Sequence, residues 1–338
     1  MRLGISLGYA GSPAPELAGA IAGAQRLGYE SIWASEAYGA DALTPLSWYG
    51  SAAPGMRLGT AIVQMSARTP TATAMAAMTL DHLSGGRAVL GLGVSGPQVV
   101  EGWYGQPYRQ PLARTREYVD VVRRVVRREV VETSGAHYPV PLPGGTGLGK
   151  PLRSTIHPLR PRIPILLAAE GPKNVALAAE IADGWIPLFY CPYDDALYRE
   201  SLREGFARRD GGAPADFEVA CLVSVEFADD VEEAADRVRP MLALYIGGMG
   251  ARGANFHYEV FARMGFEEQC VKIQDAYLAG RRADAIAAVT TPMVERVALV
   301  GPPAKVADEL AAWKDSLVTT MLVWGGEDKL ATLAELVL

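Results

Sequence analysis

The chain has 338 residues, and its 32 Lys plus Arg against 38 Asp plus Glu give a formal net charge of −6 with neutral histidines. Because the phosphates of nucleic acids and membranes are bound mainly by an excess of Lys and Arg, this balance argues against a general nucleic-acid or membrane-surface protein. Hydrophobic residues make up 49% of the chain and charged residues 21%, a composition too apolar for disorder. We therefore expect a soluble globular protein whose partner is a small-molecule substrate.

The cysteines and the N-terminus indicate where the protein resides. Cys191, Cys221 and Cys270 lie far apart, so the sequence contains neither a CxxC pair nor a disulfide framework. The apolar run at residues 3–7 is too short for the core of a signal peptide, and no stretch of about 20 apolar residues could span a membrane. We expect a cytoplasmic protein.

Apolar runs of strand length alternate along the chain with runs of helical spacing, which is the pattern of parallel βα units. The first predicted strand lies within residues 3–7, and the first predicted helix starts near Ser12 and Pro13 and ends at Gly28. Further strands are predicted at residues 31–35, 58–63, 88–93, 163–168, 183–189, 217–225 and 317–323. The intervening helices are predicted at residues 70–83, 114–128, 173–182, 195–209, 230–244 and 303–313.

Eight such units predict an α/β fold of the (β/α)8 TIM-barrel type, which typically takes about 250 residues and grows by insertion. A doubly wound open sheet is the competing architecture, but no GxGxxG turn follows the first strand. We expect a single barrel domain over residues 1–338.

Two insertions account for the extra length, at about 133–162 and 247–291. The first contains no acidic residue but carries four cations, Lys150, Arg153, Arg160 and Arg162. It joins a helix to the next strand and therefore starts at the bottom of the barrel; an anion-contacting or interface role and an ordinary loop both remain open. The second insertion is largely helical in pattern and could fold over the barrel mouth.

Metal and nucleophile motifs are missing from the sequence. The four histidines, at positions 82, 137, 157 and 257, form neither an HxH nor an HExxH pattern, so we expect no metal site. His82 lies near the end of a predicted helix, where a cap or a partner for the helix dipole is the simpler interpretation. The sequence contains no P-loop and no GxSxG elbow.

Two segments at the carboxyl ends of predicted strands carry candidate functional groups, because barrel active sites lie at that end. The first follows the second strand and contains Glu36, Tyr38 and Asp41, which could act as catalytic groups or cap a helix. The second contains Gly171 and Pro172, one of three Gly-Pro pairs that open predicted helices at positions 96–97, 171–172 and 301–302. Such a turn could present free N–H groups to an anion or simply begin a helix.

Six motifs, in this order and spacing, resemble those of the luciferase-like flavin and deazaflavin oxidoreductases, specifically the actinobacterial branch that uses coenzyme F420. They are SEAYGADA at 35–42, LGTAIV at 58–63, TLDHLSGGR at 79–87, LGLGVSGP at 90–97, AAEGP at 168–172 and ADGW at 182–185. The resemblance runs through nearly the whole chain. It implies a (β/α)8 barrel that holds the cofactor at its carboxyl-terminal face.

The resemblance also implies which residues bind the cofactor. Relatives carry a non-prolyl cis peptide in a bulge of the third strand; the matching bond joins Ala61 to Ile62, and these two residues would back one face of the redox ring. Glu36 matches an acidic residue near the ring. The remaining implied contacts are the cofactor phosphate, held by the backbone at Ala169, Glu170 and Gly171, and the cofactor side chain, lying along Gly93, Val94, Ser95 and Gly96.

Two positions depart from the F420-dependent dehydrogenases of this family. Ala37 stands where some of them have a catalytic histidine, and residues 96–98 read Gly, Pro and Gln where they have a glutamate. The acid–base pair and the sugar-phosphate substrate of those enzymes are therefore not implied. Tyr38, Asp41 and Glu36 are the candidate catalytic groups, and the aromatic residues Tyr9 and Trp103 are candidate walls of the substrate pocket.

The resemblance leaves three functions open. The first is an F420-dependent oxidoreductase that transfers a hydride between the deazaflavin and an unsaturated or carbonyl-type substrate. The second is an FMN-dependent monooxygenase, and the third is a non-catalytic deazaflavin-binding protein. Relatives are commonly homodimers or larger homo-oligomers, and we expect the same here.

Overall fold

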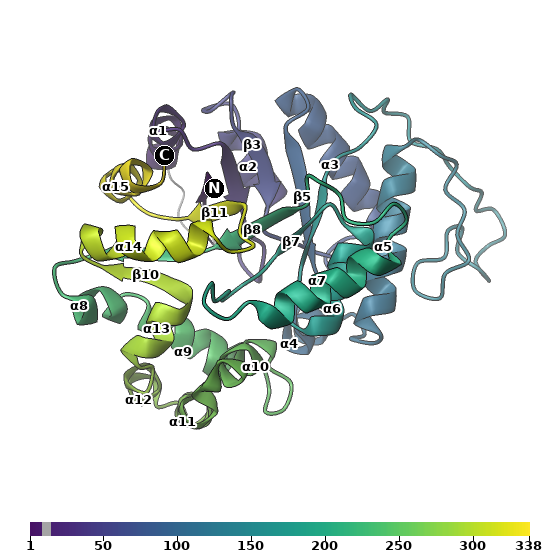
Figure 1. Ribbon diagram of the computed structural model, residues 1–338. Coiled ribbons are helices and arrows are strands. Elements are labelled where there is room, and N and C mark those ends of the chain that lie inside the picture. The colour runs from purple at the N-terminus through teal and green to yellow at the C-terminus, as the bar shows by residue number, and fades with distance from the viewer. Residues whose placement is uncertain (9–14) are drawn as a thin grey trace.

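The computed structural model describes residues 1–8 and 15–338 and shows a closed barrel of parallel strands surrounded by helices (Figure 1). Tyr9, Ser12 and Pro13, named above, lie outside the described residues. In the described part of the chain the barrel sheet contains β1 (Arg2–Ser6), β2 (Ser31–Ala34), β3 (Arg57–Thr60), β4 (Val63–Gln64), β5 (Ala88–Gly93), β6 (Ile165–Ala168), β7 (Gly184–Ile186), β8 (Glu218–Leu222) and β11 (Thr320–Val323). Pairing of β3 with β5 closes the barrel, and β3 and β4 are two parts of one predicted strand. The predicted (β/α)8 fold is confirmed.

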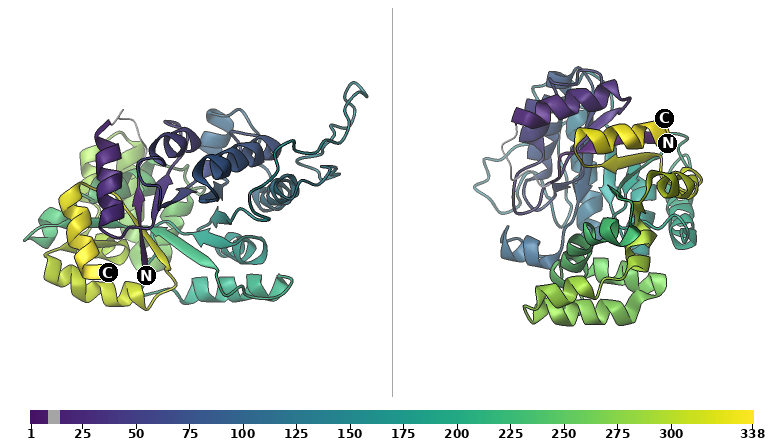
Figure 2. Two further views of the ribbon diagram at one scale, coloured as in Figure 1. Left: turned by 90° about the horizontal axis from the view of Figure 1, so that it is seen from above. Right: turned by 90° about the vertical axis from the view of Figure 1, so that its left-hand side faces the viewer.

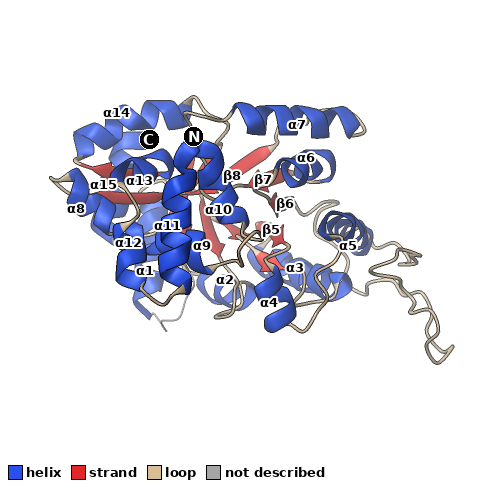
Figure 3. Ribbon diagram, turned by 90° about the horizontal axis from the view of Figure 1, so that it is seen from below, coloured by secondary structure: helices blue, strands red, loops and turns tan. Residues whose placement is uncertain are grey.

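Helices form the outer layer of the barrel, as the view coloured by secondary structure shows (Figure 3). They are α1 (Pro15–Arg26), α2 (Leu43–Tyr49), α3 (Pro70–Ser84), α4 (Pro97–Gly102), α5 (Pro111–Val126), α6 (Pro172–Ile181), α7 (Ala196–Arg208), α14 (Pro303–Lys314) and α15 (Glu327–Val337). The three Gly-Pro pairs do open helices, at α4, α6 and α14. α2 and α15 were not predicted, and α4 was predicted only at its start, by the Gly96-Pro97 pair; α2 and α4 are less than two full turns long, too short for a clear helical period.

Two predicted elements are wrong in their extent. The strand predicted at 217–225 divides at Val223 into β8 and β9 (Ser224–Phe227), and β9 pairs outside the barrel with β10 (Ala298–Gly301), which was not predicted. The helix predicted at 230–244 is two helices, α8 (Val231–Asp236) and α9 (Arg239–Gly248). Pro240 lies in the first turn of α9, where its missing N–H costs no helical hydrogen bond, so the chain restarts a helix there.

The second insertion is largely helical, as predicted. It contains α10 (Phe256–Phe261), the π-helical segment η1 (Ala262–Phe266), α11 (Glu267–Leu278), α12 (Arg282–Ala287) and α13 (Thr291–Val297). With α9, these helices enclose an apolar cluster of their own that includes Ile246, Phe261 and Ile273. They group together on one side of the barrel (Figure 1).

The first insertion projects from the body of the protein as a long loop (Figure 2). Single antiparallel bridges join Val131 to Leu152 and Thr133 to Val140, and the outer part is exposed, with Leu148 86% accessible. At its base, Arg160 pairs with Asp81 at 2.6 Å and Arg162 pairs with Asp183 at 2.6 Å. These two cations therefore anchor the loop to buried carboxylates, and a role for its tip remains a prediction.

A tryptophan fills the barrel interior. Trp33 on β2 is fully buried, packs with Val89, Leu166, Ile186, Ala220 and Leu322, and donates a hydrogen bond from Nε1 to Ser31 Oγ at 2.8 Å. Glycine at position 59 makes room for it, because a Cβ atom there would lie 2.3 Å from the indole ring. The interior is thus a packed core that ends near the carboxyl-terminal face.

The third strand bends sharply between β3 and β4, where the Ala61–Ile62 peptide bond is cis, as the resemblance implied. Thr60 fixes the bend: its Oγ1 donates to the carbonyl of Gly91 and accepts from the Gly91 N–H, both at 2.8 Å. Only glycine fits on the facing strand, since a Cβ atom on Gly91 would lie 1.9 Å from the Thr60 carbonyl oxygen. The bend therefore depends on this close approach of two backbones.

Replacing Gly91 by Ala should destabilise the protein by about 3 kcal/mol, because the methyl group has no space and backbone must shift. The free energy of unfolding from denaturant titration measures this. Gly19→Ala is the matched control: Gly19 lies within α1 with no atom within 4 Å of an added Cβ. The control should stabilise the protein by about 0.5–1 kcal/mol, and equal behaviour of the two variants would contradict the account of the bend.

Candidate functional site

The barrel mouth has an apolar floor. Ala61, Ile62 and Ala168 are half-buried and pack on the interior cluster around Trp33. Gly93 lies between them, and a Cβ atom there would be 2.8 Å from Ile62 Cγ1 and 3.5 Å from Ala168 Cβ. The missing side chain at position 93 lets Ile62 approach β5. The result is an apolar surface of the kind on which a planar ring stacks.

Glu36 lies beside this floor and is only 7% exposed. Its backbone N–H donates to the Ile62 carbonyl at 3.0 Å, which ties the end of β2 to the bend. Both carboxylate oxygens accept from Arg68 Nη1, at 2.9 and 2.8 Å. Burial raises the pKa of the Glu36 carboxyl above its ordinary value, although the charge and hydrogen bond of Arg68 act in the opposite direction.

Arg68 and Tyr104, which were not predicted from the sequence, complete the surroundings of Glu36. Tyr118 donates from its hydroxyl to the Arg68 carbonyl at 3.1 Å, which fixes the backbone that carries the guanidinium. Tyr104 donates to the Ala37 carbonyl at 3.1 Å, and burial together with the charge of Glu36 raises the pKa of its phenol. The sequence position of Arg68 could have marked it as a site residue, because it follows β4 at the carboxyl end of a barrel strand.

Asp41 and Tyr38, the other two candidate catalytic groups, lie farther toward solvent. Asp41 Oδ1 accepts from the N–H groups of Leu43 and Thr44, at 3.0 and 2.8 Å, and so caps the start of α2. Burial alone would raise the pKa of Asp41, but these hydrogen bonds and Arg68 outweigh it and lower the pKa. Tyr38 is 53% exposed and its hydroxyl lies 3.7 Å from the sulfur of Met249. A catalytic role for each remains a prediction.

The end of β6 is held by contacts from three parts of the chain. The Ala169 carbonyl accepts from Trp185 Nε1 at 2.8 Å. His257 Nδ1 lies 2.8 Å from Glu170 Oε1, and Arg263 donates to the Glu170 carbonyl at 3.2 Å. His257 and Arg263 belong to α10 and η1, so the second insertion reaches the barrel mouth as expected. The sequence gave no sign that His257 would pair with Glu170.

The remaining residues implied to hold the cofactor lie on the loops at the same face. Gly171 is the residue before α6 and has an extended backbone, with the first N–H groups of the helix behind it. Val94, Ser95 and Gly96 lead from β5 into α4, and Ser95 has a positive φ of 59°. Trp103, a candidate pocket wall, directly follows α4 and is 64% exposed.

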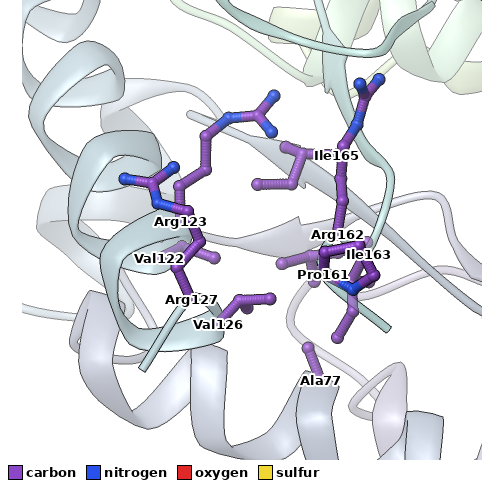
Figure 4. A pocket seen from close by; sticks show the side chains of 10 residues that line it. Ala77, Val122, Arg123, Val126, Arg127, Pro161, Arg162, Ile163 and Ile165 are labelled. Atoms are coloured by element: carbon purple, nitrogen blue, oxygen red, sulfur yellow. The ribbon is translucent and has the colours of Figure 1, made fainter. Parts of the chain in front are cut away.

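A cavity of about 100 Å³ lies away from the mouth, between α3, α5 and the segment leading into β6 (Figure 4). Apolar side chains line most of it, and its charged lining residues are Arg123, Arg127 and Arg162. None of the predicted site residues lines this cavity. Within residues 1–8 and 15–338, no three His, Cys, Asp or Glu side chains come together as a metal site would require, and no described helix is long and apolar enough to cross a membrane.

Removing Arg68 should leave the buried Glu36 carboxylate without its partner. Arg68→Met should therefore cost about 3 kcal/mol of unfolding free energy at neutral pH, since breaking a buried pair leaves an uncompensated charge. Because the folded-state pKa of Glu36 is raised, its contribution to stability is greatest below the ordinary carboxyl pKa and falls as pH rises through the raised value. Loss of Arg68 raises that pKa further, so the free energy of unfolding decreases more as pH rises through this range.

Denaturant midpoints of Arg68→Met and of Arg68→Met combined with Glu36→Gln, measured across this pH range, isolate the effect. The double variant should lose the extra pH dependence and recover most of the stability at neutral pH. If the double variant kept the same pH dependence of stability as Arg68→Met alone, Glu36 would not be the group that causes it.

Comparisons with known proteins agree on one family. The luciferase-like monooxygenase family matches residues 1–320. A Mycobacterium tuberculosis protein, whose name assigns it provisionally to the coenzyme F420-dependent oxidoreductases, is 50% identical over 343 residues, covering 100% of this chain and 99% of its own length. The phthiodiolone/phenolphthiodiolone dimycocerosates ketoreductase of Mycobacterium kansasii is 28% identical, with 80% of this chain and 72% of its own length covered.

A solved structure extends the agreement to the fold. The coenzyme F420-dependent tetrahydromethanopterin reductase of Methanopyrus kandleri superposes with a TM-score of 0.83 over 99% of this chain and 97% of its own, at 23% identity. At that identity, the likeness shows the shared barrel alone.

Proposed function

The chain belongs to the luciferase-like monooxygenase family, and we propose that it is an F420-dependent oxidoreductase that transfers a hydride between the deazaflavin and an unsaturated or carbonyl-type organic substrate. The relative at 50% identity, named for the same coenzyme, supports this proposal. The ketoreductase relative supports a carbonyl-type substrate. The observation that carries the proposal is the apolar floor beside the cis Ala61–Ile62 bond.

The residues present fit a planar redox ring. Ala61, Ile62 and Ala168 offer an apolar face, and a side chain at Gly93 would push Ile62 out of place. The end of β6, with the positive N-terminal end of α6 beside it, fits an anionic group such as a phosphate. We assign the ring to the floor and the phosphate to the backbone at Ala169, Glu170 and Gly171.

When bound, F420 supplies a carbon centre that gives or accepts a hydride. The protein's share is to keep water from one ring face with Ile62 and Ala61 and to handle the proton that accompanies reduction of a carbonyl group. Glu36 suits the proton transfer because its raised pKa lets it hold a proton at higher pH than an ordinary carboxyl. Tyr38, exposed at the mouth, is the second candidate, whereas Asp41 has a lowered pKa and suits a charged role.

The cofactor assignment predicts selective binding. Purified apoprotein titrated by fluorescence should bind F420 with micromolar or tighter affinity, and FMN at least about tenfold more weakly. Preference for FMN would contradict the proposal in favour of the monooxygenase alternative. Binding of F420 without oxidation of the reduced cofactor by any ketone, aldehyde or enone would favour the non-catalytic alternative.

We also propose a homodimer or larger homo-oligomer in the cytoplasm. The described cysteines, Cys191, Cys221 and Cys270, are free and buried, which fits a reducing compartment. The packed helices α2 and α3 expose three large apolar side chains, Trp48, Met75 and Leu83, as a subunit interface would require.

Light scattering after size-exclusion chromatography should give at least twice the chain mass. Trp48→Glu should shift the protein toward the monomer, whereas Leu148→Glu on the projecting loop should not. A monomer at all concentrations would contradict the assembly.

A further inference from the structure

One buried polar atom at the barrel mouth has no hydrogen-bond partner. Gln64, on β4, is 3% exposed; its Nε2 donates to the Glu36 carbonyl at 3.2 Å, but its Oε1 is unpaired. In the described part of the chain, Gln274 and Glu309 each also have one unpaired buried side-chain atom, and both residues lie in helices; Asp275 Oδ1, in α11, has no hydrogen bond but pairs with Arg252 at 2.5 Å. Gln64 is therefore the one such residue in a barrel strand.

The strand geometry turns the Gln64 side chain toward the mouth. Val63 is fully buried in the main cluster between the barrel and the helices, so its neighbours Ile62 and Gln64 point to the interior side. Gln64 is in register with Gly93, which has no side chain to cover it. The amide thus lies on the same side as the apolar floor, with its Nε2 on the Glu36 carbonyl.

An unpaired buried acceptor lowers the stability of the ligand-free protein. We expect a hydrogen-bond donor to pair with it in the functional, ligand-bound state. The neighbouring polar groups already have other partners: the Glu36 N–H donates to Ile62, and Arg68 donates to the Glu36 carboxylate. A ligand on the floor that carries an N–H at its edge would satisfy Oε1. A charged ligand is not needed, because the glutamine amide is neutral.

We propose that Gln64 Oε1 accepts a hydrogen bond from the ring N–H that lies between two carbonyl groups on the pyrimidinedione edge of the bound redox cofactor. This inference rests on the proposed function and deepens it. Gln64 then positions the ring on the floor of Ala61 and Ile62. Deazaflavins and flavins share this edge, so Gln64 contributes to the affinity for both and does not select between them.

The test compares cofactor binding by two matched variants. Gln64→Met keeps the length of the side chain and removes the acceptor, and it should weaken F420 binding about tenfold or more. Gln274→Met, in α11, also alters a buried glutamine with one unpaired amide atom and should leave F420 binding unchanged. FMN binding, where measurable, should weaken by a similar factor in Gln64→Met.

A ring analogue locates the hydrogen bond. Methylation of the ring N–H removes the donor, so the 3-methyl analogue of the deazaflavin should bind the wild-type protein at least about tenfold more weakly than the parent ring. In Gln64→Met the same methylation should cost much less, because the acceptor is already gone. The wild-type comparison alone is decisive if the Met variant fails to fold.

Equal binding of parent and methylated rings by the wild-type protein would overturn the role of Gln64. So would unchanged F420 affinity in a folded Gln64→Met variant, while the proposed function would stand in both cases. If the wild-type protein binds neither F420 nor FMN, the proposed function fails and the role of Gln64 fails with it.

Discussion

The structure of the mouth depends on the close approach of Thr60 to Gly91. A β-strand that continued straight through residues 58–63 would present an ordinary pleated surface to the interior. Instead the hydroxyl of Thr60 forms hydrogen bonds with both the carbonyl and the N–H of Gly91. The chain turns at Ala61 and Ile62 and then continues as β4. Ile62 and Gln64 then lie on the same side of the strand, and the missing side chain of Gly93 on the facing strand gives Ile62 room to approach β5.

The charges at the mouth are arranged around one buried carboxylate, that of Glu36, which lies next to the bend. Glu36 is anchored by its backbone to Ile62 and neutralised by Arg68, whose own backbone is held by Tyr118. A buried ion pair of this kind adds little net stability, since desolvation consumes much of the attraction. The carboxyl keeps a defined position and a raised pKa beside an apolar floor, as the proposed proton transfer would require.

The sequence predicted the parts of the molecule that local pattern determines. Strand-length apolar runs located every barrel strand, and the Gly-Pro pairs marked three helix starts. The cis bond at Ala61–Ile62 came from resemblance alone, because nothing local distinguishes Gly59 to Val63 from a plain buried strand. β10 was missed because four apolar residues after a helix carry no period, and α8 and α9 were merged because their apolar spacing continues across the break at residues 237–238.

The site residues that sequence reasoning missed are those defined by contacts between distant segments. Arg68 meets Glu36 across 32 positions, and His257 meets Glu170 across 87. Neither pair has a local motif, since each depends on the barrel bringing loops from different strands to one face. Asp41 shows the converse, because its predicted alternative as a helix cap is visible in the bonds from Leu43 and Thr44.

A crystal structure of the protein with F420 would test the central claim most directly. The account predicts the deazaflavin ring against Ala61 and Ile62, its pyrimidinedione N–H within hydrogen-bond distance of Gln64 Oε1, and its phosphate at the backbone of Glu170 and Gly171. A ring bound elsewhere, or bound at the mouth with its polar edge turned away from Gln64 and Glu36, would contradict it.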